Sequence, residues 1–326
     1  MASSPIITQL ISFLLMPAIA RLYSPALFGL FNVFGSIVGP FLTFSNFGYH
    51  HAIVLPKKDT DGSVLIYGNI IISFISSITV LLLVLLSPED LWYKLKIQQV
   101  INYWWVIPIT IFLHGINTAF TVWNQRKTKF EVIAISRVIN ALVNKVYILF
   151  MGLIGYATTG SLIIGSLIGL GIMTLVQITP FIKKKIAFPQ FDQIRSQLII
   201  YKKFPLYIMG SDMLFRATST VIFILFVIYF SEAEAGYYGM AMMIAGVPTV
   251  LIGTAIGEVF YQKAAAEKRN KNNKLVYVEL FKKLYKLSFF SFAVLALLSN
   301  ELFSIFLGQE WEQAGNFTRI LCFQMF

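Results

Sequence analysis

The chain of 326 residues is 57% hydrophobic and only 13% charged, with a formal net charge of +11. The polar gaps between its apolar runs are short, the longest being 181–204 and 262–283, which excludes a soluble domain between them. In a soluble protein, such a basic chain would suggest a nucleic-acid partner. The mean hydropathy of +0.74 instead indicates a membrane protein, and we expect no nucleic acid.

Apolar runs follow one another along the whole chain, and each is close to the roughly 20 residues that a helix needs to cross a bilayer. We therefore predict an all-α, polytopic membrane helical bundle. In the sixth run, the Gly165-x-x-x-Gly169 spacing predicts a strip along which another helix packs closely. The predicted spans are 5–20, 27–49, 64–86, 103–122, 138–155, 160–180, 205–230, 237–261 and 284–299, followed by a helix that starts near residue 315.

Basic residues are distributed unevenly between the gaps. Most of the 26 Lys and Arg residues follow the second, fourth, sixth and eighth predicted spans, whereas the intervening gaps contain only Arg21, Lys94 and Lys96. Loops that remain in the cytoplasm are enriched in Lys and Arg. The pattern predicts a multi-pass protein whose N-terminus is cytoplasmic.

Short sequence echoes relate the two halves of the chain. Gly29 and Pro40 lie in the second predicted span, and Gly236 and Pro248 have a similar spacing at the eighth. Both spans cross the membrane in the same direction, which is typical of a parallel repeat. We predict two parallel-repeat lobes. They are an N-terminal six-helix lobe, 1–185, and a partial, C-terminally incomplete lobe of about three and a half helices, 186–326.

The side-chain chemistry argues against an enzyme. Cys322 is the single cysteine, and the three histidines, two of them adjacent, have no spacing typical of a metal site. The sequence contains no nucleophile elbow, phosphate-binding loop or paired-carboxylate arrangement. We therefore expect no catalytic residues, no metal and no cofactor.

Polar residues within the predicted spans are the remaining candidates for function, because they are costly at membrane depth unless they face a cavity or a partner. Arg216 lies near the middle of the span 205–230, and Asp212 lies one turn before it. The two can neutralise each other on one helix face. Alternatively, Arg216 faces a central cavity, and Asp212 holds or releases it during a conformational change.

Two further spans carry candidate residues. In the span 138–155, Asn140 and Asn144 share one stripe, and the adjacent Lys145 either faces the cavity or extends to the cytoplasmic surface. In the span 103–122, His114 is either a buried, hydrogen-bonded imidazole or part of a proton relay. The candidate substrate-binding residues are Arg216, Lys145, Asp212, Asn140, Asn144 and His114.

Four stretches, in consistent order over the chain, resemble the polysaccharide repeat-unit exporters. These are the O-antigen and capsule (Wzx-type) flippases of the MATE-like (MOP) exporter superfamily. The stretches are 17–25 (PAIARLYSP) with Phe28-Gly29, 52–59 (AIVLPKKD), 123–127 (WNQRK) with Phe130, and 307–311 (LGQEW) with Ala314-Gly315.

The resemblance implies a two-lobed helical bundle that moves polyprenyl-pyrophosphate-linked oligosaccharide from the cytoplasmic to the periplasmic leaflet of the bacterial inner membrane. It implies the lipid-linked substrate, the phospholipid bilayer and other polysaccharide assembly proteins as partners. A cavity lined by Arg216, Lys145, Asn140 and Asn144 would offer positive charge and hydrogen bonds to such a cargo.

Two other functions remain open from the sequence. A MATE-like exporter of drugs or of a lipid-linked peptidoglycan precursor is one of them, although drug exporters that handle cations need cavity carboxylates and only Asp212 is central. The other is a membrane-embedded glycan polymerase. Such enzymes usually carry a large periplasmic loop, whereas the largest periplasmic gap here is 87–102.

Overall fold

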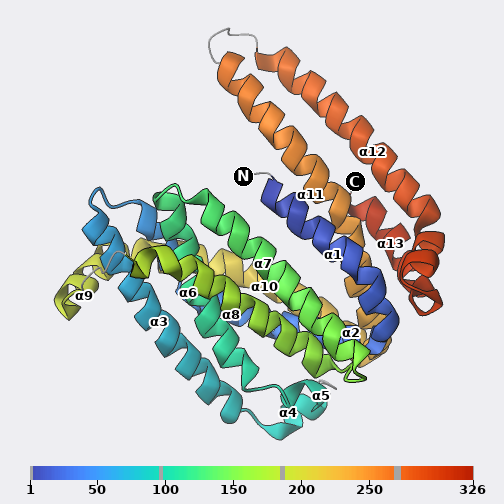
Figure 1. The fold of residues 1–326 in the computed structure, drawn as a ribbon, viewed down its shortest axis with the longest axis horizontal. Coiled ribbons are helices and arrows are strands. Elements are labelled where there is room, and N and C mark those ends of the chain that lie inside the picture. The colour runs from blue at the N-terminus through green and yellow to red at the C-terminus, as the bar shows by residue number, and fades with distance from the viewer. Residues whose placement is uncertain (1–2, 95–97, 184–187, 268–272, 326) are drawn as a thin grey trace. The chain divides into compact units, whose positions relative to one another are not determined.

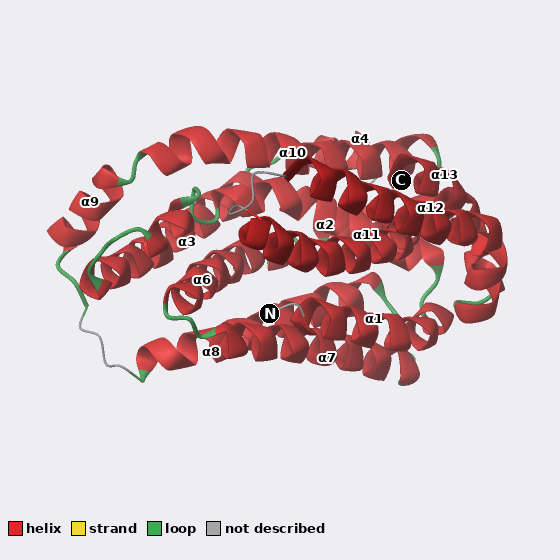
Figure 2. Ribbon diagram, turned by 90° about the horizontal axis from the view of Figure 1, so that it is seen from above, coloured by secondary structure: helices red, strands yellow, loops and turns green. Residues whose placement is uncertain are grey.

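The computed structural model describes residues 3–94, 98–183, 188–267 and 273–325, and all regular structure in these ranges is helical (Figure 1 and Figure 2). The helices are α1 (Ser3–Leu22), α2 (Pro25–Phe44), η1 (Tyr49–Val54), α3 (Asp59–Leu85), α4 (Glu89–Lys94), α5 (Gln98–Ile101), α6 (Val106–Arg126), α7 (Phe130–Leu153), α8 (Thr159–Ile182), α9 (Phe191–Ile200), α10 (Lys203–Tyr229), α11 (Glu232–Glu267), α12 (Asn273–Phe306), η2 (Gln309–Trp311) and α13 (Glu312–Met325).

Eight helices within the described ranges are long and apolar enough to cross a membrane, namely α1, α2, α3, α6, α7, α8, α10 and α12. The span predicted over 237–261 lies within α11, and the helix predicted to start near residue 315 is α13, which starts at Glu312. The prediction of an all-α, multi-pass membrane protein is confirmed.

Helix ends differ from the predicted spans where the flanking sequence is polar. Because α6 continues to Arg126 and α7 begins at Phe130, the gap predicted between these spans contracts to a tight turn in which Thr128 has a φ of 54°. Residues 191–200 were expected to lie in a gap but form α9. Hydropathy marks only the part of a helix that is apolar enough for lipid, whereas backbone hydrogen bonding continues into polar flanks.

Contacts divide the chain into two compact units. The first unit is Ala26–Ala235, and the second combines Ala2–Pro25 with Gly236–Phe326. The contacts therefore group α10 with the preceding helices and α1 with the C-terminal ones. The lobe boundary between residues 185 and 186 concerns the sequence repeat and stays a prediction.

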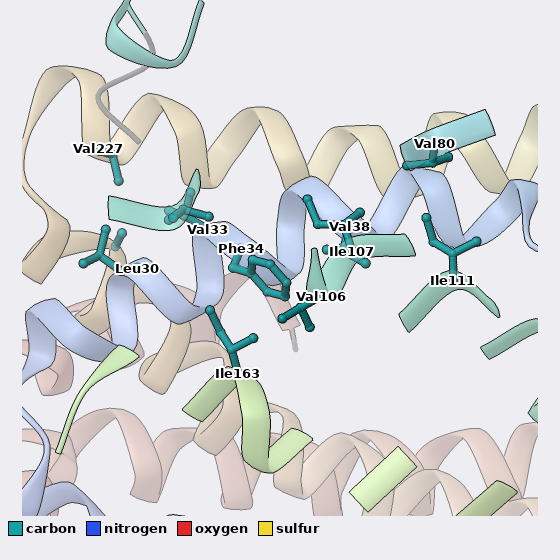
Figure 3. Packing of buried hydrophobic residues seen from close by; sticks show 12 residues of the cluster. Leu30, Val33, Phe34, Val38, Val80, Val106, Ile107, Ile111, Ile163 and Val227 are labelled. Atoms are coloured by element: carbon teal, nitrogen blue, oxygen red, sulfur yellow. The ribbon is translucent and has the colours of Figure 1, made fainter. Parts of the chain in front are cut away.

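The core of the first unit surrounds α2 and α6. About 44% of the apolar segment of α2 and 56% of that of α6 are buried. Phe34 and Val38 of α2 pack in one apolar cluster with Ile107 of α6, Ile163 of α8 and Val227 of α10 (Figure 3). These helices therefore hold one another through apolar contacts, and any polar group between them needs a specific partner.

A polar seam joins α6, α7 and α8 inside this unit. We call it the Gln177 seam; its members are Thr121, Asn124, Ser136 and Gln177. The Thr121 hydroxyl donates to Gln177 Oε1 at 2.6 Å, and Gln177 Nε2 donates to Ser136 Oγ at 3.0 Å. Asn124 Nδ2 donates to the Gln177 carbonyl at 3.0 Å. Asn124, Ser136 and Gln177 are all 0% exposed, whereas Thr121 is partly exposed, so most of the seam is buried between these helices.

The close helix packing predicted from the two glycines of α8 is confirmed. A Cβ atom at Gly165 would lie 2.8 Å from Ile148 Cγ1, and one at Gly169 would lie 2.4 Å from Asn140 Oδ1. Both distances are shorter than real Cβ contacts allow. Hydrogen in place of a side chain therefore lets α7 and α8 run side by side (Figure 1).

The second unit fastens α1 to the connection between α12 and α13. Trp311 is 0% exposed, and its Nε1 donates to the Ala20 carbonyl at 2.9 Å. Arg21 Nη2 donates to the Ile305 carbonyl at 3.3 Å. The first and last of the stretches that carry the family resemblance thus meet in one place.

Candidate functional site

The link between α2 and α3 is not a continuous helix. The apolar span was predicted to continue to residue 49, but α2 ends at Phe44. Phe47 and Gly48 follow with φ values of 49° and 75°, and the 3-10 helix η1 then begins at Tyr49. Left-handed backbone terminates an α-helix. The break turns the side chains that follow away from the face of α2 and against neighbouring helices of the same unit.

Polar side chains from this break meet α6. Asn46, which is 2% exposed, donates from Nδ2 to Thr118 Oγ1 at 2.7 Å, and its Oδ1 lies 2.8 Å from His50 Nδ1. Ser45 Oγ lies 3.3 Å from His114 Nδ1. We call these five residues the break cluster: Ser45, Asn46, His50, His114 and Thr118. Because the amide oxygen of Asn46 can only accept, the Nδ1 of His50 donates in this arrangement.

All three histidines of the chain contribute to this neighbourhood. The ring centroids of His50 and His51 are 3.9 Å apart, and His51 stacks on Phe204 of α10 with centroids 6.4 Å apart. Burial, together with positive charge on His51 and His114, lowers the pKa of His50 from 6.5 to about 3. At neutral pH, His50 is therefore uncharged.

Arg216 is the central cation of α10, 13 residues from both Lys203 and Tyr229. It interacts electrostatically with His114 of the break cluster. In the described ranges the ion pairs are those of Asp59, and neither Arg216 nor the exposed Asp212 takes part in one. The first interpretation, an ion pair between Asp212 and Arg216, is therefore not seen among the described residues.

The other predicted cavity residues lie on α7. Asn140 Nδ2 is 3.5 Å from Met173 Sδ, and both Asn140 and Asn144 border Gly169 of α8. Lys145 is partly buried and is not bonded to Arg216 in the part of the chain that the structure describes. The structure thus brings together His114 and Arg216 out of the six candidates. A substrate-binding role for all six residues, Arg216 and His114 included, stays a prediction.

An ion cluster fixes the end of the broken link to α6. Asp59 pairs with Lys127 and, at 3.2 Å, with Arg126 Nε. Arg126 Nη1 also donates to the Ile53 carbonyl at 3.0 Å, and Lys127 Nζ lies 5.1 Å from the centre of the Trp123 ring. Two of the stretches that carry the family resemblance, 52–59 and 123–127, therefore meet here and set the position of η1 beside α6.

The arrangement offers positive charge and hydrogen bonds. No group of three or more His, Cys, Asp or Glu side chains suited to a metal ion occurs among the described residues. A guanidinium that interacts with an imidazole, near hydroxyls and an amide, can bind an anionic group that also forms hydrogen bonds.

Sequence reasoning missed Ser45, Asn46, His50 and Thr118. Asn46 and His50 were assigned to the end of a span and to the gap after it, and the hydrogen bond of Asn46 to Thr118 of α6 crosses 72 positions of sequence. The useful signal was a run of polar residues and Gly48 at the end of an apolar span, because such interruptions often mark binding sites in transporters.

Comparison with known proteins agrees with this fold. The chain matches the family described as Polysaccharide biosynthesis protein over residues 18–316, and no curated protein matches it significantly. It is similar to the solved structure of an inward-facing multidrug resistance MATE family transporter of the MOP superfamily, with a TM-score of 0.73 and 16% identity, covering 97% of this chain and 79% of that one. It is also similar to a crystal structure of a MATE mutant, with a TM-score of 0.59 and 14% identity, covering 99% and 77%.

At these identities the structural likeness establishes the fold alone, and the MATE-like fold class is confirmed. The family and the fold point to a membrane transporter rather than an enzyme. Because the family match spans nearly the whole chain, the protein belongs to the family described as Polysaccharide biosynthesis protein.

Proposed function

We propose that this protein moves polyprenyl-pyrophosphate-linked oligosaccharide from the cytoplasmic to the periplasmic leaflet of the bacterial inner membrane. A sugar–pyrophosphate headgroup cannot cross hydrocarbon alone, because its charges and hydroxyls would lose their water. The polyprenyl tail can remain in lipid throughout. The protein's task is therefore to shield and bind the headgroup.

The observation that carries the proposal is the uncompensated charge of Arg216. It lies at the centre of a membrane-spanning helix, without a carboxylate within ion-pair distance in the described ranges, and beside the break cluster. A cation at this depth is costly and is retained where it binds something of opposite charge. Arginine suits phosphate, because its planar donors form two parallel hydrogen bonds.

The distribution of basic residues supports the proposed orientation. Arg126, Lys127 and Lys129 cluster at the turn between α6 and α7, whereas the opposite end of α10 is followed by Glu232 and Glu234. A reporter inserted after Thr128 is expected to be cytoplasmic, and one after Glu234 periplasmic. The reverse result would contradict the orientation and the proposed direction of transport.

Replacement of Arg216 tests the function. In a flippase-deficient strain that depends on this protein, we expect Arg216→Ala to lower surface polysaccharide by on the order of tenfold to a hundredfold, the loss that one charge-assisted contact predicts. Arg216→Lys should retain part of the activity if charge alone matters, and should lose it if both guanidinium contacts are needed.

The matched control is Arg195→Ala, which removes an exposed cation of α9. All variants are compared at equal abundance in the membrane, measured by immunoblot. Normal surface polysaccharide with Arg216→Ala would remove this residue from the binding site. A loss that is equal for Arg195→Ala would show a general effect of cytoplasmic charge instead.

A further inference from the structure

Helix α2 contains a proline, Pro40, within its membrane span. In an α-helix each carbonyl accepts a hydrogen bond from the N–H four residues later, and proline has no N–H. The carbonyl of Ser36 therefore has no backbone donor at residue 40. Ser36 is only 8% exposed, and its own hydroxyl donates to the Val33 carbonyl at 2.8 Å. Because a buried acceptor without a donor is costly, a donor from another helix would stabilise α2 at this point.

Thr220 of α10 supplies that donor. Its hydroxyl donates to the Ser36 carbonyl and so joins the two helices. The same hydroxyl also lies 3.3 Å from the carbonyl of Arg216, one turn earlier in its own helix. A hydroxyl has one hydrogen, so a stronger bond to one of these carbonyls weakens the bond to the other. Thr220 therefore has two alternative acceptors, one on α2 and one on α10.

Contacts between α10 and the segment that begins with α2 lie on both sides of this hydrogen bond. Nearer the start of α2, Val33 belongs to the same apolar cluster as Val227 (Figure 3). Beyond the end of α2, a Cβ atom built at Gly48 would lie 3.7 Å from Ile208 Cβ. The two segments are therefore antiparallel neighbours, and the bond from Thr220 lies between their other contacts.

Another face of this part of α2 is open. Cβ atoms built at Gly35 and Gly39 would meet no atom within 4 Å among the described residues of this unit. Proline and glycine within a helix are common causes of a kink, because they weaken the backbone hydrogen bonding or leave the backbone free to turn. Residues 35–40 can therefore bend without displacing a side chain packed against these glycines.

We propose that residues 35–40 form a hinge in α2, and that Thr220 sets the position of this hinge. In the present conformation the Thr220 hydroxyl holds α2 through the Ser36 carbonyl. When α2 bends away from α10, the hydroxyl donates to the Arg216 carbonyl instead. This inference rests on the proposed function and adds to it a moving part, one helical turn from the cation proposed to bind the headgroup. Thr220 is a positioning residue, because it acts through α2 and not on the substrate.

Two substitutions and their combination test the hydrogen bond. Thr220→Val keeps the shape of the side chain and removes the donor, so we expect the unfolding temperature of the purified protein to fall by a few degrees. Pro40→Ala restores an N–H for the Ser36 carbonyl and should raise the unfolding temperature. In the Pro40→Ala background, Thr220→Val should cost less stability than in wild type, because the restored N–H replaces the lost hydroxyl.

Transport distinguishes a hinge from a contact that only stabilises the fold. We expect Thr220→Val, Pro40→Ala and the double variant each to lower surface polysaccharide by about twofold to thirtyfold, the range for residues that couple two states. Pro40→Ala should do so although it is more stable than wild type, because a stiffer α2 bends less. If Thr220 only stabilised the fold, the double variant would recover transport together with stability.

Two controls accompany these variants, and all are compared at equal abundance in the membrane. Thr220→Ser keeps the hydroxyl and should transport close to wild type. Thr218→Val removes a hydroxyl that donates to the Leu214 carbonyl of the same helix, and it should transport normally.

Hydrogen exchange of the full chain in lipid nanodiscs tests the hinge without measuring transport. The backbone amides of residues 37–39 and 41–44 should exchange faster in Thr220→Val than in wild type, because α2 is no longer held by α10. In Pro40→Ala they should exchange more slowly. Thr218→Val should match wild type.

The outcomes separate this inference from the proposed function. If wild type restores no polysaccharide, or if Arg216→Ala restores it fully, the proposed anion site is wrong, and unfolding and exchange still decide whether the hinge exists. If Thr220→Val costs the same stability in both backgrounds, or if Pro40→Ala leaves transport and exchange unchanged, the hinge is wrong and the anion site stands.

Discussion

The Gln177 seam and the break cluster are both polar regions inside one apolar unit, but they differ in two respects. In the seam the interacting groups are neutral, and Asn124, Ser136 and Gln177 are completely buried. In the break cluster Ser45 and Asn46 are also buried, but His50, His114 and Thr118 are partly accessible. His114 interacts electrostatically with Arg216, which has no ion pair among the described residues. Buried, neutral polar groups stabilise the association of helices, whereas a binding site for an anion needs charged groups that the ligand can reach.

The strongest test of this comparison measures, for each variant, its effect on transport and its effect on stability. Arg216→Ala should abolish most transport while the thermal unfolding temperature of the purified protein stays within a few degrees of wild type, because no described residue loses an ion-pair partner. Thermal unfolding in detergent and surface polysaccharide in cells are measured on the same variant. A large drop in unfolding temperature would make Arg216 a structural residue.

Gln177→Leu should give the opposite result. It removes two side-chain hydrogen bonds and leaves the Thr121 and Ser136 hydroxyls without this partner, so we expect a loss of about 1–3 kcal/mol in stability. Transport per folded molecule should remain near wild type. Thr179→Val, which removes an exposed hydroxyl bonded within its own helix, is the control. Unchanged stability of Gln177→Leu would show that the seam does not hold the helices.

Gly169→Ala tests packing next to the seam. Its Cβ would lie 2.4 Å from Asn140 Oδ1, so α7 and α8 must separate, at a cost of about 1–2 kcal/mol. Gly171→Ala, whose Cβ would find only Leu113 Cδ1 at 3.9 Å, should be neutral. Adding Asn140→Ala to Gly169→Ala should restore part of the stability in thermal unfolding. No rescue would mean that the backbone, rather than this amide, sets the helix separation.

The smallest expected effect concerns pH. Because the pKa of His50 is about 3 in the folded chain and near 6.5 when unfolded, the unfolded chain binds more protons between these values, and stability falls as the pH drops through this window. Asn46→Asp places a carboxylate against His50 Nδ1, raises the pKa of His50 and should weaken this acid sensitivity. The acid sensitivity is measured as the difference in unfolding temperature between pH 7.5 and pH 5, with Asn46→Ser as the uncharged control. An equal difference for both variants would contradict the assignment of this acid sensitivity to His50.

The fold was largely predictable because the bilayer imposes a length and a hydropathy on every crossing helix. The end of α2 was not, since left-handed backbone at Phe47 cannot be inferred from a bulky apolar residue, a type that rarely adopts it. Helix α9 was missed for a related reason, because its residues are too polar for a span and helix formation there does not depend on lipid.

The candidate site was only partly predictable. Arg216 and His114 could be found because a polar group in a span stands out by itself. The sequence could not show that they are near each other, or that His50 joins them, because these contacts depend on the break in α2 and on packing between distant helices. Asn140 and Asn144 are also polar residues within a predicted span, as His114 is. The structure instead places them against Gly169 of α8.

The hydrogen bond from Trp311 to the Ala20 carbonyl spans 291 positions of sequence. During synthesis the first helix enters the membrane long before the ribosome reaches the tryptophan that will hold it. At typical elongation rates the interval is on the order of tens of seconds. Throughout that time α1 must be accommodated by lipid or by the insertion machinery, so α1 reaches its final contacts only after nearly 300 further residues have been made.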